Sequence, residues 1–403
     1  IDRHNIPKKE EYDEKLTRWK QSHQPFHWWI EFYGIMKRGG FDVIIGNPPY
    51  VEYKNVRYLY TVRGFTTESC DDLYALVMER SKVLLGSSGN LGMIVPISVV
   101  STDGFVPLRE FLLKSYTVTW TSSFAERPAK LFTGVEKRLT IWLTTSRAGT
   151  KKSFLSTYRR WFSEERDSQF REKDVLFSQM RYVEDDAASS VIVDSVIPKI
   201  ASSTELNLLA RLFTNRQLSH YFQKHTGCIV YYTRKLRYFV QFYDFVPLIR
   251  DHKGETVEPS ELKELYLGDQ IKRDMVIALL NSNLFFWFFN ALSDVRNVNR
   301  REIEHFRCSL DLMESNLIES LITLKGQLMD DFQIHSKCLT NNYGKFGILT
   351  IQTFQPRISK PIIDEIDRVL ARHYGFTDEE LDFIINYDIK YRMGRDSGDE
   401  EGG

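Results

Sequence analysis

The residues best suited to chemistry are an Asn-Pro-Pro-Tyr stretch at positions 47–50, directly after the apolar run Phe41 to Ile45. That run is rich in β-branched residues, which is typical of a buried strand in a parallel sheet. Gly46 then permits a turn, and two prolines fix the backbone after Asn47. The sequence therefore predicts a rigid loop at the carboxyl end of a strand, the edge where α/β sheets bind ligands.

Such a loop suits an exocyclic amine on an aromatic ring, which is a poor nucleophile because its lone pair is delocalised into the ring. The Asn47 amide oxygen and the Pro48 carbonyl would both accept its hydrogen bonds and free the lone pair for attack on a methyl sulfonium. Pro48 places no N–H beside that carbonyl, and Tyr50 offers a face for an extruded base. The alternative is a tight proline turn after a strand.

This stretch resembles motif IV of the amino-methyltransferases that use S-adenosylmethionine, above all the DNA adenine-N6 enzymes. The resemblance implies direct transfer of a methyl group to the amine of a flipped adenine, with no metal and no covalent intermediate. It also implies catalytic roles for the four motif residues and one later aromatic residue: Asn47, Pro48, Pro49, Tyr50 and Phe132.

Phe132 lies in a loop, residues 124–135, that precedes an expected strand at 138–143. The loop resembles motif VIII of the same family, in which an aromatic ring stacks on the far face of the target base. Phe124 is the second choice for that ring, and core packing is the alternative for Phe132. Arg127 and Lys130 in this loop are expected to contact DNA phosphates.

Composition limits the ways in which the chain can bind DNA. Lys plus Arg and Asp plus Glu both number 54 among 403 residues, so DNA binding needs a local basic surface. Four scattered cysteines without a Cys-x-x-Cys pair argue against a zinc ribbon or a disulfide framework and favour the cytoplasm. The longest apolar run, Val276 to Leu292, is too short and too polar to span a bilayer, so no membrane partner is expected.

Residues 228–242 interleave basic and aromatic side chains and are the expected local basic surface, with a solvated hairpin as the alternative. The helix expected at 272–289 leads into residues 293–302, where Arg and Asn are suited to reading base edges. The run from Ile277 resembles the TaqI-like C-terminal specificity domain of type IIG restriction–modification proteins. The predicted DNA-binding residues here are Arg234, Lys235, Arg237, Arg296, Asn297, Asn299 and Arg300.

The expected fold class is α/β. A partial Rossmann-like methyltransferase sheet occupies residues 1–150, and residues 151–200 form a linker. An α+β target-recognition domain follows at 201–345, and C-terminal helices with an acidic tail fill 346–403. The aromatic run 26–33 is expected to pack on the sheet, with nucleotide stacking as the alternative. The loop 51–67 either contacts phosphates or is a solvated connection.

The expected cofactor is S-adenosylmethionine, but its main half-site is expected to lie outside this chain. In the family, the Gly-rich motif I lies upstream of Asn-Pro-Pro-Tyr, and the residues before Asn47 contain no Gly-x-Gly after a strand. The remaining cofactor contacts are assigned to Asp42, Asn47 and Asp72. Asp72 resembles the start of motif V, although helix capping alone also explains it. The chain alone is expected to be inactive and to need its missing N-terminal half or a restriction subunit.

Together these features predict a cytoplasmic, site-specific DNA adenine-N6 methyltransferase that acts on double-stranded DNA in a restriction–modification or phage-defence system. Two alternatives stay open. One is an amino-methyltransferase for protein glutamine or RNA adenine, and the other is a truncated, non-catalytic DNA-specificity module. The recognition sequence does not follow from the residues.

Overall fold

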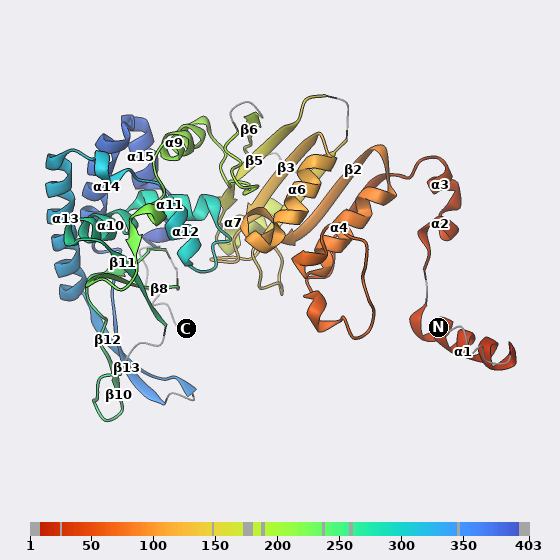
Figure 1. Ribbon diagram of the computed structural model, residues 1–403, viewed down its shortest axis with the longest axis horizontal. Coiled ribbons are helices and arrows are strands. Elements are labelled where there is room, and N and C mark those ends of the chain that lie inside the picture. Colours follow the sequence, from red (N-terminus) through yellow and green to blue (C-terminus); the bar gives the residue numbers. More distant parts are fainter. Residues whose placement is uncertain are drawn as a thin grey trace.

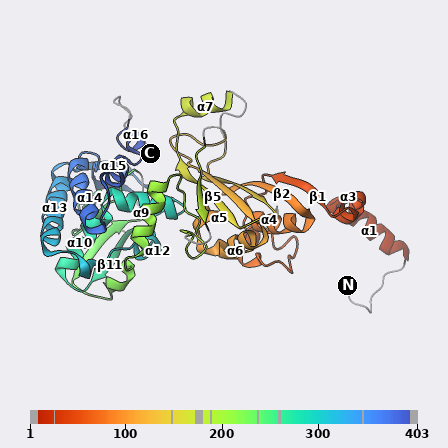
Figure 2. The same ribbon diagram turned by 90° about the horizontal axis from the view of Figure 1, so that it is seen from above.

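A computed structural model describes residues 9–24, 26–146, 149–171, 180–186, 190–235, 238–257, 261–344 and 347–394. Arg237 and the acidic tail from residue 396 onward lie outside these ranges. Figure 1 shows a strand-rich part and a helix-rich part side by side, and Figure 2 shows the same division from above.

The strand-rich part is one six-stranded sheet in the order β1-β2-β4-β3-β5-β6. Its strands are β1 Phe41–Gly46, β2 Leu85–Pro96, β3 Val118–Phe124, β4 Leu139–Thr145, β5 Lys152–Arg159 and β6 Val183–Asp186. β1 pairs with β2 in parallel and β3 with β5 in parallel, whereas β4 runs antiparallel between β2 and β3. Strands β1, β2, β3 and β5 therefore all end at one edge, which confirms the expected α/β class.

Residues 151–200 were expected only to link this sheet to the next domain, and that expectation is wrong for much of the span. β5 pairs with β3 along nearly its whole length, and β6 pairs with β5 antiparallel. Leu155 and Tyr158 of β5 are buried in the core, which ties this strand to the sheet. In the described part of this span, the helix α7 Ser163–Arg171 and the segment from residue 190 leave the sheet.

Two helices, α4 Leu73–Leu84 and α6 Val106–Ser115, lie on one face of the sheet (Figure 1). Their buried side chains join the main core, which continues into the C-terminal part. A smaller cluster around Phe124 and Trp161 forms a second core. The short turns α5 Ser98–Ser101 and η3 Asp103–Phe105 connect β2 to α6.

The N-terminal segment contains α1 Lys9–His23, α2 Trp28–Glu31 and α3 Tyr33–Lys37, which extend away from β1 (Figures 1 and 2). The aromatic run was expected to pack on the sheet, and this is wrong for most of its members. Only Trp28 and Phe32 pack on a strand residue, Phe41. Most of the other side chains of the run are exposed, because the edge of β1 beyond them carries no further strand among the described residues.

The C-terminal part surrounds two small antiparallel sheets with helices. One sheet has the order β7-β11-β8-β9, and the other β10-β13-β12. The helices are α9 Ser203–Phe213, α10 Gln270–Leu280, α11 Asn283–Leu292, α12 Arg300–His305, α13 Ser315–Ile334, α14 Lys360–Tyr374, α15 Asp378–Asn386 and α16 Ile389–Arg392. The strands are β7 Phe222–Gln223, β8 Cys228–Thr233, β9 Phe242–Tyr243, β10 Ile249–Asp251, β11 Leu262–Leu267, β12 Lys337–Asn342 and β13 Ile348–Thr353.

The expected single helix at 272–289 is two helices, α10 and α11, bent by 66° at their junction. Ser282 causes the break because its hydroxyl accepts the Phe285 amide and starts a new helix. Asn281 holds the junction in place, since its side-chain amide pairs with both the N–H and the carbonyl of Phe242. In the described residues, no single helix meets the length and hydropathy of a membrane span, and this bent pair does so only when both halves are joined.

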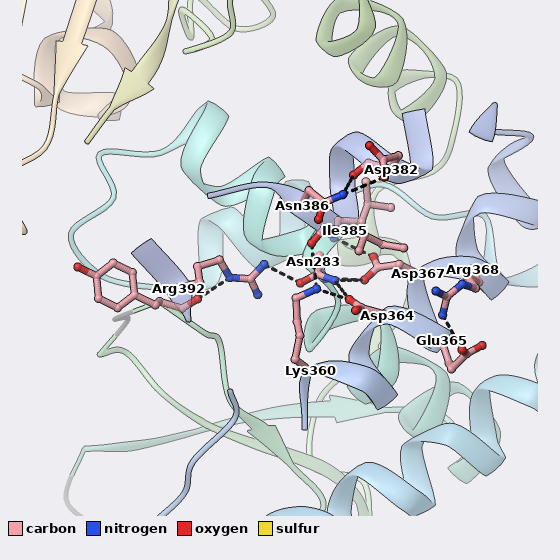
Figure 3. Close-up of polar contacts among 12 residues, drawn as sticks. Asn283, Lys360, Asp364, Glu365, Asp367, Arg368, Asp382, Ile385, Asn386 and Arg392 are labelled. Carbon is pink, nitrogen blue, oxygen red and sulfur yellow. Dashed lines mark hydrogen bonds and ion pairs between the residues drawn. The ribbon is translucent and has the colours of Figure 1, made fainter. Parts of the chain in front are cut away.

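The last helices are fixed to this body by a buried polar cluster (Figure 3). The Asp367 carboxylate accepts the amides of Asn283 and Leu284 and so caps the first turn of α11. Arg392 donates to the Asn283 side-chain oxygen at 2.6 Å and lies over the Phe286 ring. α14 and α16, both in the span 346–403, therefore pack as parts of the same helical body as α11.

Arg160 joins the two parts where β5 ends. Its guanidinium donates to Asn290 of α11 at 2.6 Å and forms an ion pair with Asp388. The Tyr391 hydroxyl donates to the Arg160 carbonyl at 2.7 Å. The sheet thus ends against the helical body on this side.

Candidate active site

The candidate site lies where β1, β2 and β3 end, because the loops after all three strands meet at that edge. These loops are residues 47–72, 97–105 and 125–138. The second and third loops are joined by a backbone hydrogen bond from the Ile97 amide to the Arg138 carbonyl at 3.0 Å. Arg138 also forms an ion pair with Glu126 across the third loop at 3.3 Å.

Asn47 follows the last residue of β1 and is exposed, and no described residue hydrogen-bonds to its side chain. Pro48 is buried, and Pro49 is exposed. Gly46 is still in register with Met93 of β2, and a side chain there would meet the Met93 sulfur at 3.3 Å. Gly46 therefore permits close strand packing, while the prolines set the direction of the loop.

Tyr50 is half-buried and held in one orientation. Its hydroxyl donates to the Ile94 carbonyl of β2 at 2.9 Å, and its ring meets Tyr74 edge-on at 6.5 Å. Burial raises the pKa of Tyr50 to about 12, so the hydroxyl stays a neutral donor. The ring packs against both hydrophobic cores and is therefore a fixed surface beside Asn47.

Tyr74 is a buried residue in contact with Tyr50, and the sequence analysis did not identify it as part of the site. The side chain is fully buried, its hydroxyl lies 3.1 Å from the Ser98 hydroxyl, and its ring stacks on Phe105 at 5.1 Å. The sequence feature that could have identified Tyr74 is its position on the apolar face of the helix that Asp72 caps. Tyr74 fixes the position of Tyr50.

Asp72 caps α4 by accepting the Tyr74 amide at 3.4 Å, so the capping interpretation describes its observed contact. Burial raises the pKa of this carboxyl to about 6. Asp42, in contrast, is an exposed residue near the amino end of β1. Five residues of extended strand separate it from Asn47 by roughly 16 Å, and the structure does not bring the two together.

Phe132 is half-buried and packs on the same small cluster as Tyr50. Phe124, the second choice for a stacking ring, is fully buried inside that cluster and offers no free face. Arg127 is exposed, whereas Lys130 pairs with Glu136 at 2.7 Å. The structure therefore places Phe132 and both basic residues on the loop next to the Asn47 edge.

The predicted DNA-binding residues of the C-terminal part come from two segments that lie side by side. The Val298 amide donates to the Arg234 carbonyl at 2.9 Å, and Lys235 forms an isolated bridge with Asn297. Arg234 also donates to the Asn299 side-chain oxygen at 2.6 Å. Since the two segments are sixty residues apart in the chain, the sequence alone did not predict this pairing.

Several of these residues already have partners within the chain. Asn299 caps α12 in a capping box with Glu302. Arg300 pairs with Glu304 at 2.6 Å, and Lys235 pairs with Glu261 at 3.2 Å, both on the surface. Such exposed pairs are weak and leave both cations accessible to a polyanion. Arg296 is exposed and has no ion-pair partner among the described residues.

The loop 293–299 has an unusual backbone. Val295 is buried with a φ of +56°, a conformation that β-branched residues rarely adopt. The Ser293 hydroxyl accepts the Val295 amide at 2.9 Å and holds this turn. The neighbouring Arg296 is thereby presented outward on a tightly held loop.

A buried lysine, which the sequence did not reveal, positions the same loop. Lys199 donates to the carbonyls of Ala291 and Ser293 at the end of α11, at 3.0 and 2.5 Å. Burial lowers the pKa of Lys199 to about 7. A single lysine between apolar residues carries no pattern, so only its tertiary contacts identify this role.

α12, which follows the loop 293–299, is connected to the loop that carries Asn47 by a chain of contacts. Arg301 of α12 pairs with Asp103 at 2.7 Å, across the boundary between the two parts. Asp103 starts the turn that ends at Phe105, whose ring stacks on Tyr74, which in turn contacts Tyr50. No group of three or more metal-ligating side chains gathers in the described part of the chain.

The sheet therefore carries the Asn-Pro-Pro-Tyr loop at the edge where β1, β2 and β3 end. Residues 2–132 match the family described as Eco57I restriction-modification methylase. This match bears out, for that segment, the predicted resemblance to restriction–modification methyltransferases.

Two curated relatives are each similar in sequence to a short segment of this chain. RM.MjaORFECS2P of Methanocaldococcus jannaschii, a putative type II restriction enzyme and methyltransferase, is 38% identical over 108 residues, which is 27% of this chain and 8% of the relative. The type II restriction enzyme and methyltransferase RM.Eco57I of Escherichia coli is 33% identical over 91 residues, 21% of this chain and 9% of the relative. The alignments therefore span less than a tenth of either relative.

Two solved structures align with a larger share of this chain, but their structural similarity to it is low. The type IIL restriction-modification enzyme MmeI in complex with DNA has a TM-score of 0.42 at 10% identity, covering 90% of this chain and 58% of that one. The type IIG restriction endonuclease BpuSI has a TM-score of 0.32 at 10% identity, covering 87% and 54%. Scores this low do not by themselves define a shared fold.

Proposed function

We propose that this chain forms the acceptor side of a site-specific DNA adenine-N6 methyltransferase. The observation that carries the proposal is the loop after β1, where the exposed Asn47 amide and the Pro48 carbonyl stand beside the fixed ring of Tyr50. The match of residues 2–132 to a restriction–modification methylase family supports the methyltransferase class.

In this proposal the adenine amine donates its two hydrogens to the Asn47 side-chain oxygen and the Pro48 carbonyl. Both oxygens are oriented before the base arrives, so little reorganisation opposes the reaction. Tyr50 and Phe132 hold the two faces of the extruded ring by stacking. The neutral Tyr50 hydroxyl, bound to the Ile94 carbonyl, keeps its ring from turning.

S-adenosylmethionine would supply the methyl group as an electrophilic sulfonium. The described residues fit only part of its site. One carboxylate oxygen of Asp72 takes the Tyr74 amide, and the other has no hydrogen-bond partner among the described residues, so it suits a cationic group of the cofactor. Asn47 and Asp72 begin and end the loop between β1 and α4, whereas Asp42 lies roughly 16 Å from Asn47 along β1.

We propose that a further part of the catalytic sheet pairs with the open edge of β1 and brings the main cofactor half-site. Val43 and Ile45 on this strand are 55% and 78% exposed, which is unusual for apolar strand residues. The partner is then an N-terminal half or a separate subunit, and this chain alone is inactive. Val43 and Ile45 share one face of the sheet, so backbone pairing along β1, together with elements of the added part that cover this face, would bury both side chains.

On the DNA side, we propose that the segments around Arg234 and Arg296 contact the recognition sequence and that the loop with Arg127 and Lys130 contacts phosphates. The adjacency of the two C-terminal segments supports this, since it gathers cations and amides on one surface. A role in a restriction–modification or phage-defence system, with or without a restriction subunit, and a cytoplasmic location complete the proposal.

Nucleoside analysis of duplex DNA after incubation with S-adenosylmethionine and the protein, in the form in which it occurs in its cell, tests this function. We expect N6-methyldeoxyadenosine as the product. Methylated cytosine would overturn the adenine assignment. Methylation of RNA or of protein glutamine, with none of DNA, would favour the first alternative, and binding without any methylation would favour a specificity module.

A further inference from the structure

The loop 51–72 leaves Tyr50 and returns to α4, and its two ends are hydrogen-bonded to each other. The Tyr53 amide donates to the Asp71 carbonyl at 2.8 Å, and the Leu73 amide donates to the Val51 carbonyl at 3.0 Å. The loop therefore starts and ends within one residue of the elements that hold the candidate acceptor site.

Its interior is braced although it lies on the surface. The Tyr53 hydroxyl donates to the Tyr60 carbonyl at 3.1 Å and accepts the Val62 amide at 2.9 Å. The Glu79 carboxylate of α4 accepts both backbone amides of residues 66–67 at 2.9 Å. These bonds give the loop a fixed shape in place of a family of conformations.

The tip of this braced loop is apolar and exposed. Tyr58, Leu59 and Tyr60 are 79%, 61% and 46% exposed and consecutive in the chain. A cluster of this kind on a rigid support marks a contact surface, because single exposed apolar residues are ordinary but contiguous ones are not. The side chains are held away from the sheet, so they add nothing to the core.

The basic and the acidic residues of this loop lie in different parts of it. Every charged residue between Tyr53 and Thr67 is a cation, namely Lys54, Arg57 and Arg63. The acids lie at the base, and Arg57 and Arg63 have no ion-pair partner in the part of the chain that the structure describes. An apolar tip flanked by cations fits a polyanion with an apolar interior, which is the chemistry of duplex DNA.

We propose that Tyr58 and Leu59 form a wedge that enters the base stack of duplex DNA and fills the space left by the base that reaches Asn47. The inference rests on the proposed function, since it names how the same site obtains its base. In Figure 1 the loop projects below α4, on the side of the sheet where the 125–138 loop also projects. Arg57 and Arg63 hold the phosphates on either side of the inserted residues.

A wedge would lower the free-energy cost of extruding the target base. Inserting apolar side chains offsets the cost of unstacking and unpairing the target base. The wedge therefore matters for a fully paired target and matters little when the target is already unpaired. A loop that only touched the DNA surface would help both kinds of duplex equally.

The test uses the protein in the form in which it occurs in its cell and duplexes that it selects from a randomised pool, with 2-aminopurine at the target adenine and either a matched or a mismatched opposite base. The double variant Tyr58→Ala with Leu59→Ala is compared with the unaltered protein. Tyr12→Ala, at a tyrosine on α1 that is 47% exposed, serves as the control for loss of a surface aromatic residue. Circular dichroism of all variants checks the fold.

We expect the double variant to bind the matched duplex about tenfold or more weakly and to lose the fluorescence increase of the extruded base. Its affinity for the mismatched duplex should stay within about twofold of the unaltered protein, and Tyr12→Ala should change neither. Unchanged binding of both duplexes, or an equal loss on both, overturns the wedge but leaves the proposed function intact. If the unaltered protein binds no duplex from the pool, the proposed function itself fails.

Discussion

Asn47 in the strand-rich part and Asn299 in the helix-rich part each lie in a loop next to a secondary-structure element, but their side-chain amides have different surroundings. Asn47 follows β1 on a loop fixed by prolines, and no described residue bonds to its side chain. Asn299 precedes α12, caps that helix and accepts a hydrogen bond from Arg234 at 2.6 Å. A free amide on a rigid loop is available to a ligand, whereas a satisfied amide already stabilises the fold.

The comparison separates the proposed catalytic role of Asn47 from the structural role of Asn299. In the C-terminal part, Arg296 is an exposed group that the strained turn at Val295 presents outward. Asn299 donates to the Asn297 carbonyl at 3.2 Å, within the same loop. The following predictions test this separation, beginning with the largest expected effect.

Asn47→Ala should lower the rate constant of methyl transfer by about 100-fold or more, because the variant loses a preorganised acceptor for the amine. DNA affinity should change little, since Asn47 makes no contact that holds the fold. Methyl incorporation with excess DNA measures the first quantity, and fluorescence anisotropy measures the second. A matched loss of affinity and rate would mean that Asn47 only binds DNA.

Arg296→Ala should weaken DNA binding by roughly tenfold, the usual range for loss of a base or phosphate contact by arginine. If Arg296 reads a base, the loss should be confined to the recognition sequence. If it contacts a phosphate, the loss should extend to all sequences, and the salt dependence should decrease by about one ion. Anisotropy titrations at several salt concentrations distinguish these outcomes. Affinity equal to that of the unaltered protein would remove Arg296 from the interface.

Asn299→Ala should lower the free energy of unfolding by about 1 kcal/mol, because α12 loses its capping residue. Asn299→Asp is the matched control, since aspartate caps a helix equally well. Urea unfolding followed by circular dichroism measures both variants. If Asn299→Ala leaves stability unchanged and only impairs DNA binding, the contrast with Asn47 disappears.

Asp72→Asn should change the pH dependence of stability. Burial raises the pKa of Asp72 to about 6 in the folded protein, above its usual value of 3.8. As the pH rises from about 4 to about 6, the unfolded chain releases this proton first, so the folded state loses stability. Asparagine keeps the helix cap without the charge, and the variant should lack this loss and melt higher at pH 7. Identical melting profiles between pH 4 and 8 would contradict this assignment.

The sequence predicted the features that depend on neighbouring residues. The strand, glycine and prolines around Asn47 are local, and so is the cap of α4 at Asp72. The long helix α14 likewise ends at Gly375, as its left-handed backbone requires. These elements are set by side chains within a few residues of each other.

Features that depend on distant contacts were missed or misjudged. The break between α10 and α11 relies on Ser282 and on the bond between Asn281 and the Phe242 backbone, inside a run that reads as one apolar helix. β5 joins the sheet through pairing with β3, which no local pattern in residues 151–200 indicated. Phe124 and Phe132 also look equivalent in sequence, and only packing shows that Phe124 is core.

The most direct measurement is a structure of this protein bound to duplex DNA that contains its recognition sequence. The account expects one adenine extruded from the helix, with its amine about 3 Å from both the Asn47 side-chain oxygen and the Pro48 carbonyl. The ring should lie between Tyr50 and Phe132. A complex in which every adenine stays stacked, or in which the extruded amine contacts neither oxygen, would contradict the account.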